Sequence, residues 1–119
     1  MATYTKIPLS GATDFRGIKV TTVGPVDGSD TTIHTAQASA TLPDVVTLFG
    51  YNSDTVARWV ELGWGGTTSP DDLFRQTIPA ASGMILLAEL PIRNSLVVVA
   101  AAEVANKIII FGYVNRISA

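Results

Sequence analysis

His34 is the only histidine in this sequence and its best candidate for general acid–base chemistry. A serine hydrolase would also need a serine nucleophile and an aspartate that orients the imidazole ring, and Asp27, Asp30 and Asp44 are the nearby choices. No serine lies in the G-x-S-x-G motif that forms a nucleophile elbow. The sequence therefore favours a structural histidine on a strand, bonded to one polar partner.

The acidic pairs of the sequence offer two other kinds of chemistry. Asp27 and Asp30 in VDGSDTT carry oxygen ligands suited to calcium, but the EF-hand spacing is absent and the segment is typical of a polar turn. Asp71 and Asp72 resemble the paired carboxylates of glycosidases. Adjacent strand residues point to opposite faces, however, and the preceding Pro70 indicates a turn in which an aspartate accepts backbone hydrogen bonds.

The glycines of the segment GWGG, Gly63, Gly65 and Gly66, are not followed by the lysine and helix of a phosphate-binding loop. We interpret them as a tight connection that needs positive backbone angles. From these absences we predict that the protein is not an enzyme, with no catalytic residue, no metal site and no cofactor.

Composition limits the partners. The chain has 119 residues, which fits a single domain over 1–119, and its net charge of -2 with no cluster of Lys or Arg predicts no nucleic-acid partner. It contains no cysteine, so disulfides and thiolate zinc sites are excluded. Residues 1–10 lack the apolar core of a signal peptide, and Leu96–Ala102 is far shorter than the roughly 20 residues of a membrane-spanning helix. We predict no membrane association.

Alternating apolar and polar residues, interrupted by turn formers, predict strands about every 8 to 12 residues. The fold class expected is all-β, a single antiparallel β-sandwich of about eight strands with a jelly-roll or Ig-like Greek key order. Residues 1–14 are expected to form an extended N-terminal arm or an edge strand, and Gly112 to mark a bulge or a close backbone approach. The predicted strands are Ile18–Val23, Thr31–Ala38, Asp44–Tyr51, Val56–Trp64, Asp71–Pro79, Met84–Leu90, Leu96–Ala102 and Lys107–Ile117.

Several of these strands are apolar on both faces. Strand alternation predicts core faces that contain Val46 and Leu48, Val60, Leu62 and Trp64, and Ile108, Ile110 and Val114. The opposite faces then carry Phe49, Tyr51, Trp59, Phe111 and Tyr113. Each large aromatic buries on the order of 150 to 250 Å² in a core or interface. Either another part of the chain covers these residues or a partner does, and aromatics of this kind also stack on sugars.

A resemblance to short virion proteins of tailed bacteriophages is carried by three motifs, WGGTTSPDDL, the turn Thr77–Ala80 and the segment GYVNRI at Gly112–Ile117. The similarity spans Lys6–Ile117. Trp59 and Gly63 depart from the pattern, in which a polar residue and a glutamate tend to occupy the matching strand. The family has no well-established catalytic residues to transfer.

The resemblance implies a capsid cement or decoration protein that binds the major capsid protein or other virion proteins, as a homo-oligomer, with a trimer favoured. Its location would then be the virion, on the capsid surface, after assembly in the host cytoplasm. The alternatives are a component of the tail, baseplate or head fibre, and a host-glycan-binding module.

The N-terminal arm adds one expectation. Ala2–Leu9 is rich in threonine and has no obvious partner within the domain, so it could add a strand to a neighbour's sheet, and its deletion should leave the fold intact. The residues predicted to make intermolecular contacts are Tyr4, Ile7, Leu9, Phe49, Tyr51, Trp59, Phe111 and Tyr113.

Overall fold

The structure is a computed structural model that describes residues 3–81 and 83–119, and within these residues it contains strands and no helix. All pairs of strands are antiparallel. The strands are β1 (Thr3–Ile7), β2 (Ile18–Lys19), β3 (Thr31–Thr35), β4 (Asp44–Asn52), β5 (Arg58–Trp64), β6 (Leu73–Ile78), β7 (Ile85–Ile92), β8 (Val97–Ala102) and β9 (Ile108–Ser118). The all-β class is confirmed.

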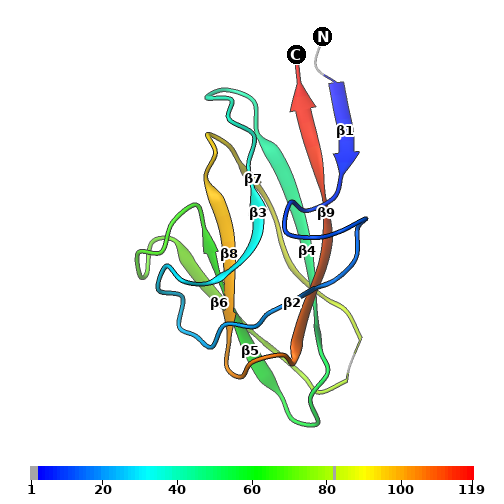
Figure 1. Ribbon diagram of the computed structural model, residues 1–119, viewed down its shortest axis with the longest axis vertical. Coiled ribbons are helices and arrows are strands. Elements are labelled where there is room, and N and C mark those ends of the chain that lie inside the picture. The colour runs from blue at the N-terminus through cyan, green and yellow to red at the C-terminus, as the bar shows by residue number, and fades with distance from the viewer. Residues whose placement is uncertain (1–2, 82) are drawn as a thin grey trace.

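The strands form two sheets. The five-stranded sheet has the order β1-β9-β4-β7, and β2 pairs with β9 on the same edge as β1, farther along the strand. The four-stranded sheet has the order β3-β8-β5-β6. Figure 1 shows the sheets side by side, with the start of β1 and the end of β9 at one tip of the molecule.

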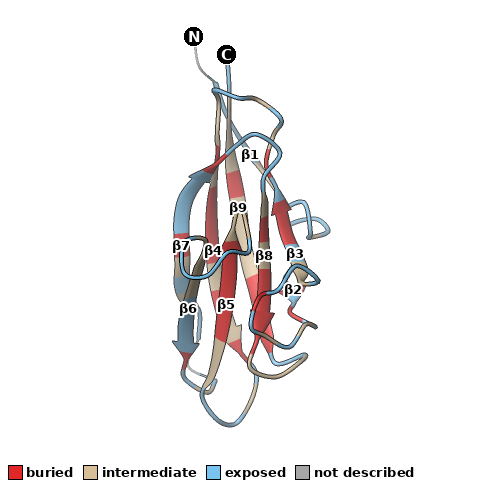
Figure 2. Cartoon of the chain, turned by 90° about the vertical axis from the view of Figure 1, so that its left-hand side faces the viewer, coloured by how far each residue is buried: buried red, intermediate tan, exposed pale blue. Residues whose placement is uncertain are grey.

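The core lies between the two sheets. Val46 and Leu48 of β4 and Val60 and Leu62 of β5 are buried in one cluster with Ile110 of β9. Buried residues follow the central strands of both sheets, whereas β6 and much of β7 are exposed (Figure 2). These core faces are the ones that the alternation predicted, because one face of each central strand must meet the opposite sheet.

The observed strands differ from the predicted ones in their bounds, and two of these differences have a clear physical reason. Only Ile18–Lys19 of the predicted strand Ile18–Val23 pairs with β9, after which the chain crosses to the other sheet, where Val23 forms a bridge with Ala102. The segment predicted to turn at Pro91 instead continues β7 to Ile92. A proline is tolerated there because β7 is an edge strand that pairs only with β4.

Strand alternation predicts that Ile33 and His34 lie on opposite faces of β3, and this prediction is wrong. The register between β3 and β8 shifts between Thr32 and His34, and both Ile33 and His34 are buried. An extra residue in one strand lets two successive side chains turn inward, which simple alternation does not anticipate.

In the N-terminal segment 1–14, Thr3–Ile7 form an edge strand, and residues 8–14 continue as a loop. β1 pairs with β9 from Thr3 opposite Ser118 to Ile7 opposite Val114, so the expectation that this segment has no partner in the domain is wrong. Leu9 is 0% exposed and belongs to the core cluster. Deleting residues 1–9 would therefore remove a strand and a core side chain, contrary to the expected intact fold. Met1 and Ala2 lie outside the described residues.

Candidate interaction surface

His34 is part of a buried network that leaves no ring nitrogen for a nucleophile. Its Nδ1 atom accepts a hydrogen bond from the Ser10 backbone N–H at 3.0 Å, so Nε2 carries the proton and donates to Asp44 Oδ2 at 2.8 Å. The Ser10 hydroxyl accepts from the backbone N–H of Thr35 at 2.7 Å. Although Asp44 does orient His34, the ring is 1% exposed and holds strands together instead of facing a substrate.

The predicted turn chemistry of the other aspartates is confirmed. Asp27 Oδ1 accepts from Ser29, and Asp30 Oδ2 accepts from the backbone N–H of Gly28 at 2.8 Å. These bonds to Ser29 hold the pKa of Asp27 below its ordinary value. Among the described residues, no group of three or more potential ligands of the His, Cys, Asp and Glu type could hold a metal ion.

Asp72 closes the turn after β5. Its carboxylate accepts from the Thr68 backbone N–H at 3.1 Å, while its carbonyl accepts from the Trp64 backbone N–H at 2.9 Å. Gly65 in this connection has a φ of +80°, the left-handed angle predicted for it, whereas the same prediction is wrong for Gly63 and Gly66. The turn is therefore stabilised by its own polar groups.

The outer face of the five-stranded sheet brings most of the predicted contact residues together. In the register of β4 and β9, Phe49 lies opposite Phe111 and Thr47 opposite Tyr113, while Tyr51 pairs with Ile109. Their neighbours along each strand point into the core, so alternation places these side chains on the outside. We call this surface the aromatic face: Tyr4, Val45, Phe49, Tyr51, Ile109, Phe111, Tyr113 and Ile117.

Within the described residues, no strand lies over the aromatic face, because all their strands belong to the two sheets. Tyr4 is 68% exposed, whereas Phe49, Tyr51, Phe111 and Tyr113 are each half-buried. The second sheet does not cover these aromatics, because it packs on the opposite face. The N-terminal segment covers part of them, since Lys6 lies over the Tyr113 ring and Gly17 packs closely against Phe111. Aromatics that the fold covers only in part are typical of an interaction surface.

The cations beside the aromatic face lie toward β1 and β2. The Lys6 ammonium is 4.4 Å from the centroid of the Tyr113 ring, a cation–π distance. Lys19 is exposed and pairs with Ile109, so it projects on the same side. On the β7 side, Glu89 accepts from the Thr47 hydroxyl at 3.5 Å. The face is thus basic along one edge and carries one acid near the other.

Trp59 is not part of this face. It lies on the outer side of the four-stranded sheet, where the Arg75 guanidinium stacks 3.7 Å from its ring centroid and Gly24 packs against the ring. Arg75 also donates to Glu61, whose other oxygen accepts from the Val26 backbone N–H at 2.9 Å. Through these contacts, Trp59 holds the segment between β2 and β3 against the four-stranded sheet.

Two other predicted contact residues point inward. Ile7 is half-buried against the core, and Leu9 is fully buried within it, which leaves Leu9 no surface for a partner. Leu9 is therefore corrected to a core residue. Ile7 and Leu9 lie two residues apart, and both side chains pack against the core because this segment runs along its edge.

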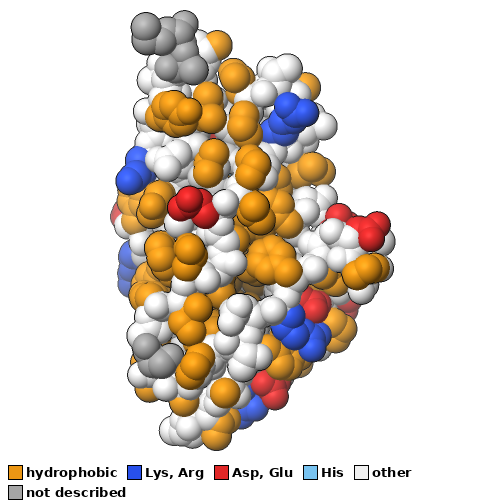
Figure 3. All heavy atoms as spheres, turned by 180° about the vertical axis from the view of Figure 1, so that it is seen from behind, with side chains coloured by type: hydrophobic (Ala, Val, Ile, Leu, Met, Phe, Trp, Pro, Cys, Tyr) orange, Lys and Arg blue, Asp and Glu red, His pale blue; other side chains and the backbone are white. Residues whose placement is uncertain are grey.

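Sequence reasoning missed the apolar edge formed by β7. Met84, Leu86 and Leu90 are each about half exposed, and Leu86 pairs with Phe49, so the aromatic face extends onto this strand. From behind, hydrophobic side chains run along most of the molecule with few charges among them (Figure 3). The signal was present in ILLAELPI, which is apolar on both faces even though it forms an edge strand.

No family model matches this chain, and neither does any curated protein or solved structure. The likeness to phage virion proteins rests on the sequence motifs and stays a prediction. The described residues also contain no helix long and apolar enough to cross a membrane.

Proposed function

We propose that this protein is a structural protein of a tailed-phage virion, a cement or decoration protein that binds the capsid through its aromatic face. The observation that carries the proposal is the collection of Tyr4, Phe49, Tyr51, Phe111 and Tyr113 on the one face of the sheet that the second sheet leaves open. A soluble monomer rarely leaves such a surface open, and aromatic residues are enriched where proteins bind one another. The partner proposed is the major capsid protein, and the activity is binding without catalysis.

The strand order supports a jelly-roll β-sandwich as the fold of this proposal. With β1 and β2 counted as one edge position, the eight positions run 1-8-3-6 in one sheet and 2-7-4-5 in the other. This is the order of a jelly roll, an architecture that recurs in viral capsid proteins and in lectins. Because the likeness is one of fold alone, it supports a virion role and is equally compatible with the glycan-binding alternative.

Symmetry makes modest contacts sufficient for this function. In a homotrimer at a local three-fold position, three copies of the aromatic face would engage the capsid together. Once one copy is bound, the others bind at a high effective concentration, so weak single contacts add up to durable attachment. A few copies in a ring at the tail would instead favour the tail, baseplate or head-fibre alternative.

Replacing Phe49 and Phe111 together by alanine is expected to weaken the affinity for the capsid at least about 30-fold, since a single central aromatic residue can be worth about 2 kcal/mol or more at an interface. The measurement is binding of the purified protein to phage capsids that lack it, by co-sedimentation. The matched control is Val23→Ala with Val56→Ala, which truncates two exposed side chains away from this face and should leave occupancy unchanged.

Thermal unfolding of each variant identifies any loss of binding that comes from loss of fold. If the double variant is unstable, Tyr4→Ala replaces it, because Tyr4 is 68% exposed and contributes little to the core. Occupancy of both face variants equal to that of the wild type would rule out the aromatic face as the binding surface.

A further inference from the structure

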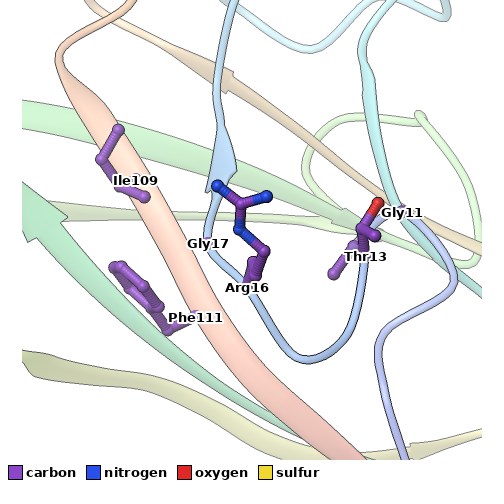
Figure 4. A pocket seen from close by; sticks show the side chains of 7 residues that line it. Gly11, Thr13, Arg16, Gly17, Ile109 and Phe111 are labelled. Carbon is purple, nitrogen blue, oxygen red and sulfur yellow. The ribbon is translucent and has the colours of Figure 1, made fainter.

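A hollow of about 510 Å³ lies between the loop that follows β1 and the outer side of β9. Figure 4 shows Arg16 standing between Ile109 and Phe111 of β9 on one side and Gly11 and Thr13 on the other. Because Ile109 and Phe111 belong to the aromatic face, the hollow opens at the end of that face.

The loop that builds the hollow is fixed at several points. The Gly11 N–H donates to the Ile33 carbonyl at 2.9 Å, and the Arg16 N–H donates to the Thr13 carbonyl at 2.9 Å. A Cβ atom at Gly17 would lie 2.6 Å from the Ile109 side chain and 2.8 Å from the Phe111 ring, so only glycine permits this close approach. The walls of the hollow are therefore held in place by contacts within the fold.

Two residues of this loop adopt an unfavourable backbone. Asp14 and Phe15 have φ values of +51° and +63°, in the left-handed region that residues with side chains seldom occupy. Conformations of this kind persist where the surrounding structure imposes them, and they concentrate at ligand-binding sites. The turn they form places Arg16 at the hollow and leaves Phe15 exposed at 48%.

The charge at the hollow is unpartnered. Among the described residues, the side chain of Arg16 makes no ion pair and no hydrogen bond, whereas Arg58, Arg75 and Arg116 are all ion-paired. Lys19 projects on the same side through its pairing with Ile109. Asp14 in the loop is the nearest acid in sequence and makes no ion pair with Arg16. A chain with a net charge of -2 thus exposes a free guanidinium beside an aromatic wall.

We propose that this hollow binds a carboxylate carried beside an apolar group, namely an Asp or Glu side chain next to an apolar side chain on the protein that the aromatic face contacts. This proposal rests on the proposed function, since the carboxylate would belong to the capsid protein that the aromatic face binds. The guanidinium fork of Arg16 matches the two oxygens of a carboxylate, and the Thr13 hydroxyl can add a hydrogen bond. Ile109 and Phe111 supply the apolar wall.

The hollow fits a carboxylate better than a nucleic-acid backbone. Phosphate backbones are bound by runs of cations that neutralise several charges, whereas Arg16 is the only cation among the described residues that line this hollow. Apart from the two glycines, three of the five lining residues have apolar side chains, namely Ala12, Ile109 and Phe111. A single carboxylate with an attached apolar group satisfies both features.

The first experiment measures the chemistry of the hollow with a matched pair of probes, 3-phenylpropionate and its amide. Both are titrated into the isolated protein and followed by the amide NMR signals of Gly11 and Gly17. We expect the acid to bind at least about tenfold more tightly than the amide, since a charge-assisted pair is worth about 1.4 kcal/mol or more. Arg16→Gln should remove this preference, and Arg93→Gln, whose guanidinium donates to the Thr41 carbonyl, should retain it.

The second experiment tests the source of the carboxylate, with capsid co-sedimentation of Arg16→Gln at low and high salt. We expect reduced occupancy and a weaker salt dependence than in the wild type, because an ion pair with the capsid has been removed. Occupancy and salt dependence equal to those of the wild type would overturn the assignment to a protein partner.

Failure of this inference is distinguishable from failure of the proposed function. Equal binding of acid and amide, or unchanged acid binding in Arg16→Gln, would overturn the inference, while the Phe49 and Phe111 variants still test the capsid role. No capsid binding by the wild type would overturn the proposed function and, with it, the protein partner named here.

Discussion

Replacing Asp44 by asparagine is expected to lower the free energy of unfolding by about 3 kcal/mol, since removing one partner of a buried charged network costs about 3 to 5 kcal/mol. The carboxylate is 0% exposed, and its Oδ1 accepts from Arg116 at 2.8 Å. Oδ2 accepts from His34, Arg116 and the Gln37 backbone N–H at 2.8, 2.8 and 3.1 Å. Asparagine offers one acceptor oxygen, so its NH₂ group would face a donor.

The lower end of that range applies because Arg116 is partly exposed and can turn toward water. Urea unfolding followed by the fluorescence of the two tryptophans measures the change, and the melting temperature should fall by roughly 10 °C for a domain of this size. Asp71→Asn is the matched control, since Asp71 is exposed and should shift stability by less than about 0.5 kcal/mol. Equal stability of the two variants would mean that the Asp44 network contributes nothing to the fold.

The same residue predicts how stability depends on pH. Burial alone would raise the pKa of Asp44, but hydrogen bonds from Arg116 and His34 outweigh it and hold the pKa below its ordinary value. The ionised carboxylate therefore stabilises the fold above the unfolded pKa of about 3.9, and this contribution is lost as pH falls through the lower folded pKa. The stability difference between wild type and Asp44→Asn should shrink between pH 5 and pH 2.

Asp27 and Asp54 also have lowered pKa values. Both residues are present in the wild type and in Asp44→Asn, so their contributions cancel from the stability difference between the two proteins. Urea is the denaturant of choice because it adds no salt that would screen the ion pairs. A difference that stays constant from pH 5 to pH 2 would contradict the ionised Asp44 at the centre of the network.

The fold was largely predictable because its strands obey a simple alternation. In β4, β5 and β9 one face meets the opposite sheet, so hydrophobic spacing alone identified both the strands and their core sides. Prediction failed where the chain departs from regular pairing. The bulge in β3 buried two successive residues, and the strand predicted after Gly17 stopped at Lys19 because the chain crossed to the other sheet.

The candidate surface was predictable only in part. Aromatics opposite the core face could be identified from strand alternation, which is why Phe49, Phe111 and Tyr113 were found. Trp59 has the same sequence signature, yet a loop and the Arg75 guanidinium pack on it. Arg16 lies in a loop without periodicity, and its position beside β9 depends on contacts between residues about a hundred positions apart, which no local pattern encodes.

Replacing Gly112 by alanine is expected to destabilise the protein by about 3 kcal/mol or more, the upper end of the cost of overpacking. A Cβ atom there would overlap the carbonyl oxygen of Thr47 on the neighbouring strand. Gly112 pairs with Leu48 without a register shift, so of the two predicted alternatives, a bulge or a close approach, the close approach is correct. A backbone carbonyl in a strand pair cannot rotate away, so β4 and β9 would have to separate.

Gly50→Ala is the matched control for Gly112→Ala, because both glycines lie in central strands of the same sheet. A Cβ atom at Gly50 would meet the ends of two flexible side chains, 2.7 Å from Ile78 and 3.0 Å from Leu87. These side chains can move, so the expected cost is about 1 kcal/mol. Urea unfolding of both variants compares them directly, and a cost for Gly112→Ala no greater than that for Gly50→Ala would contradict the close approach of β4 and β9. Gly112→Ala could also yield no folded protein while Gly50→Ala folds. That result would likewise support the close approach of β4 and β9 at Gly112, because it is a larger loss of stability of the expected kind.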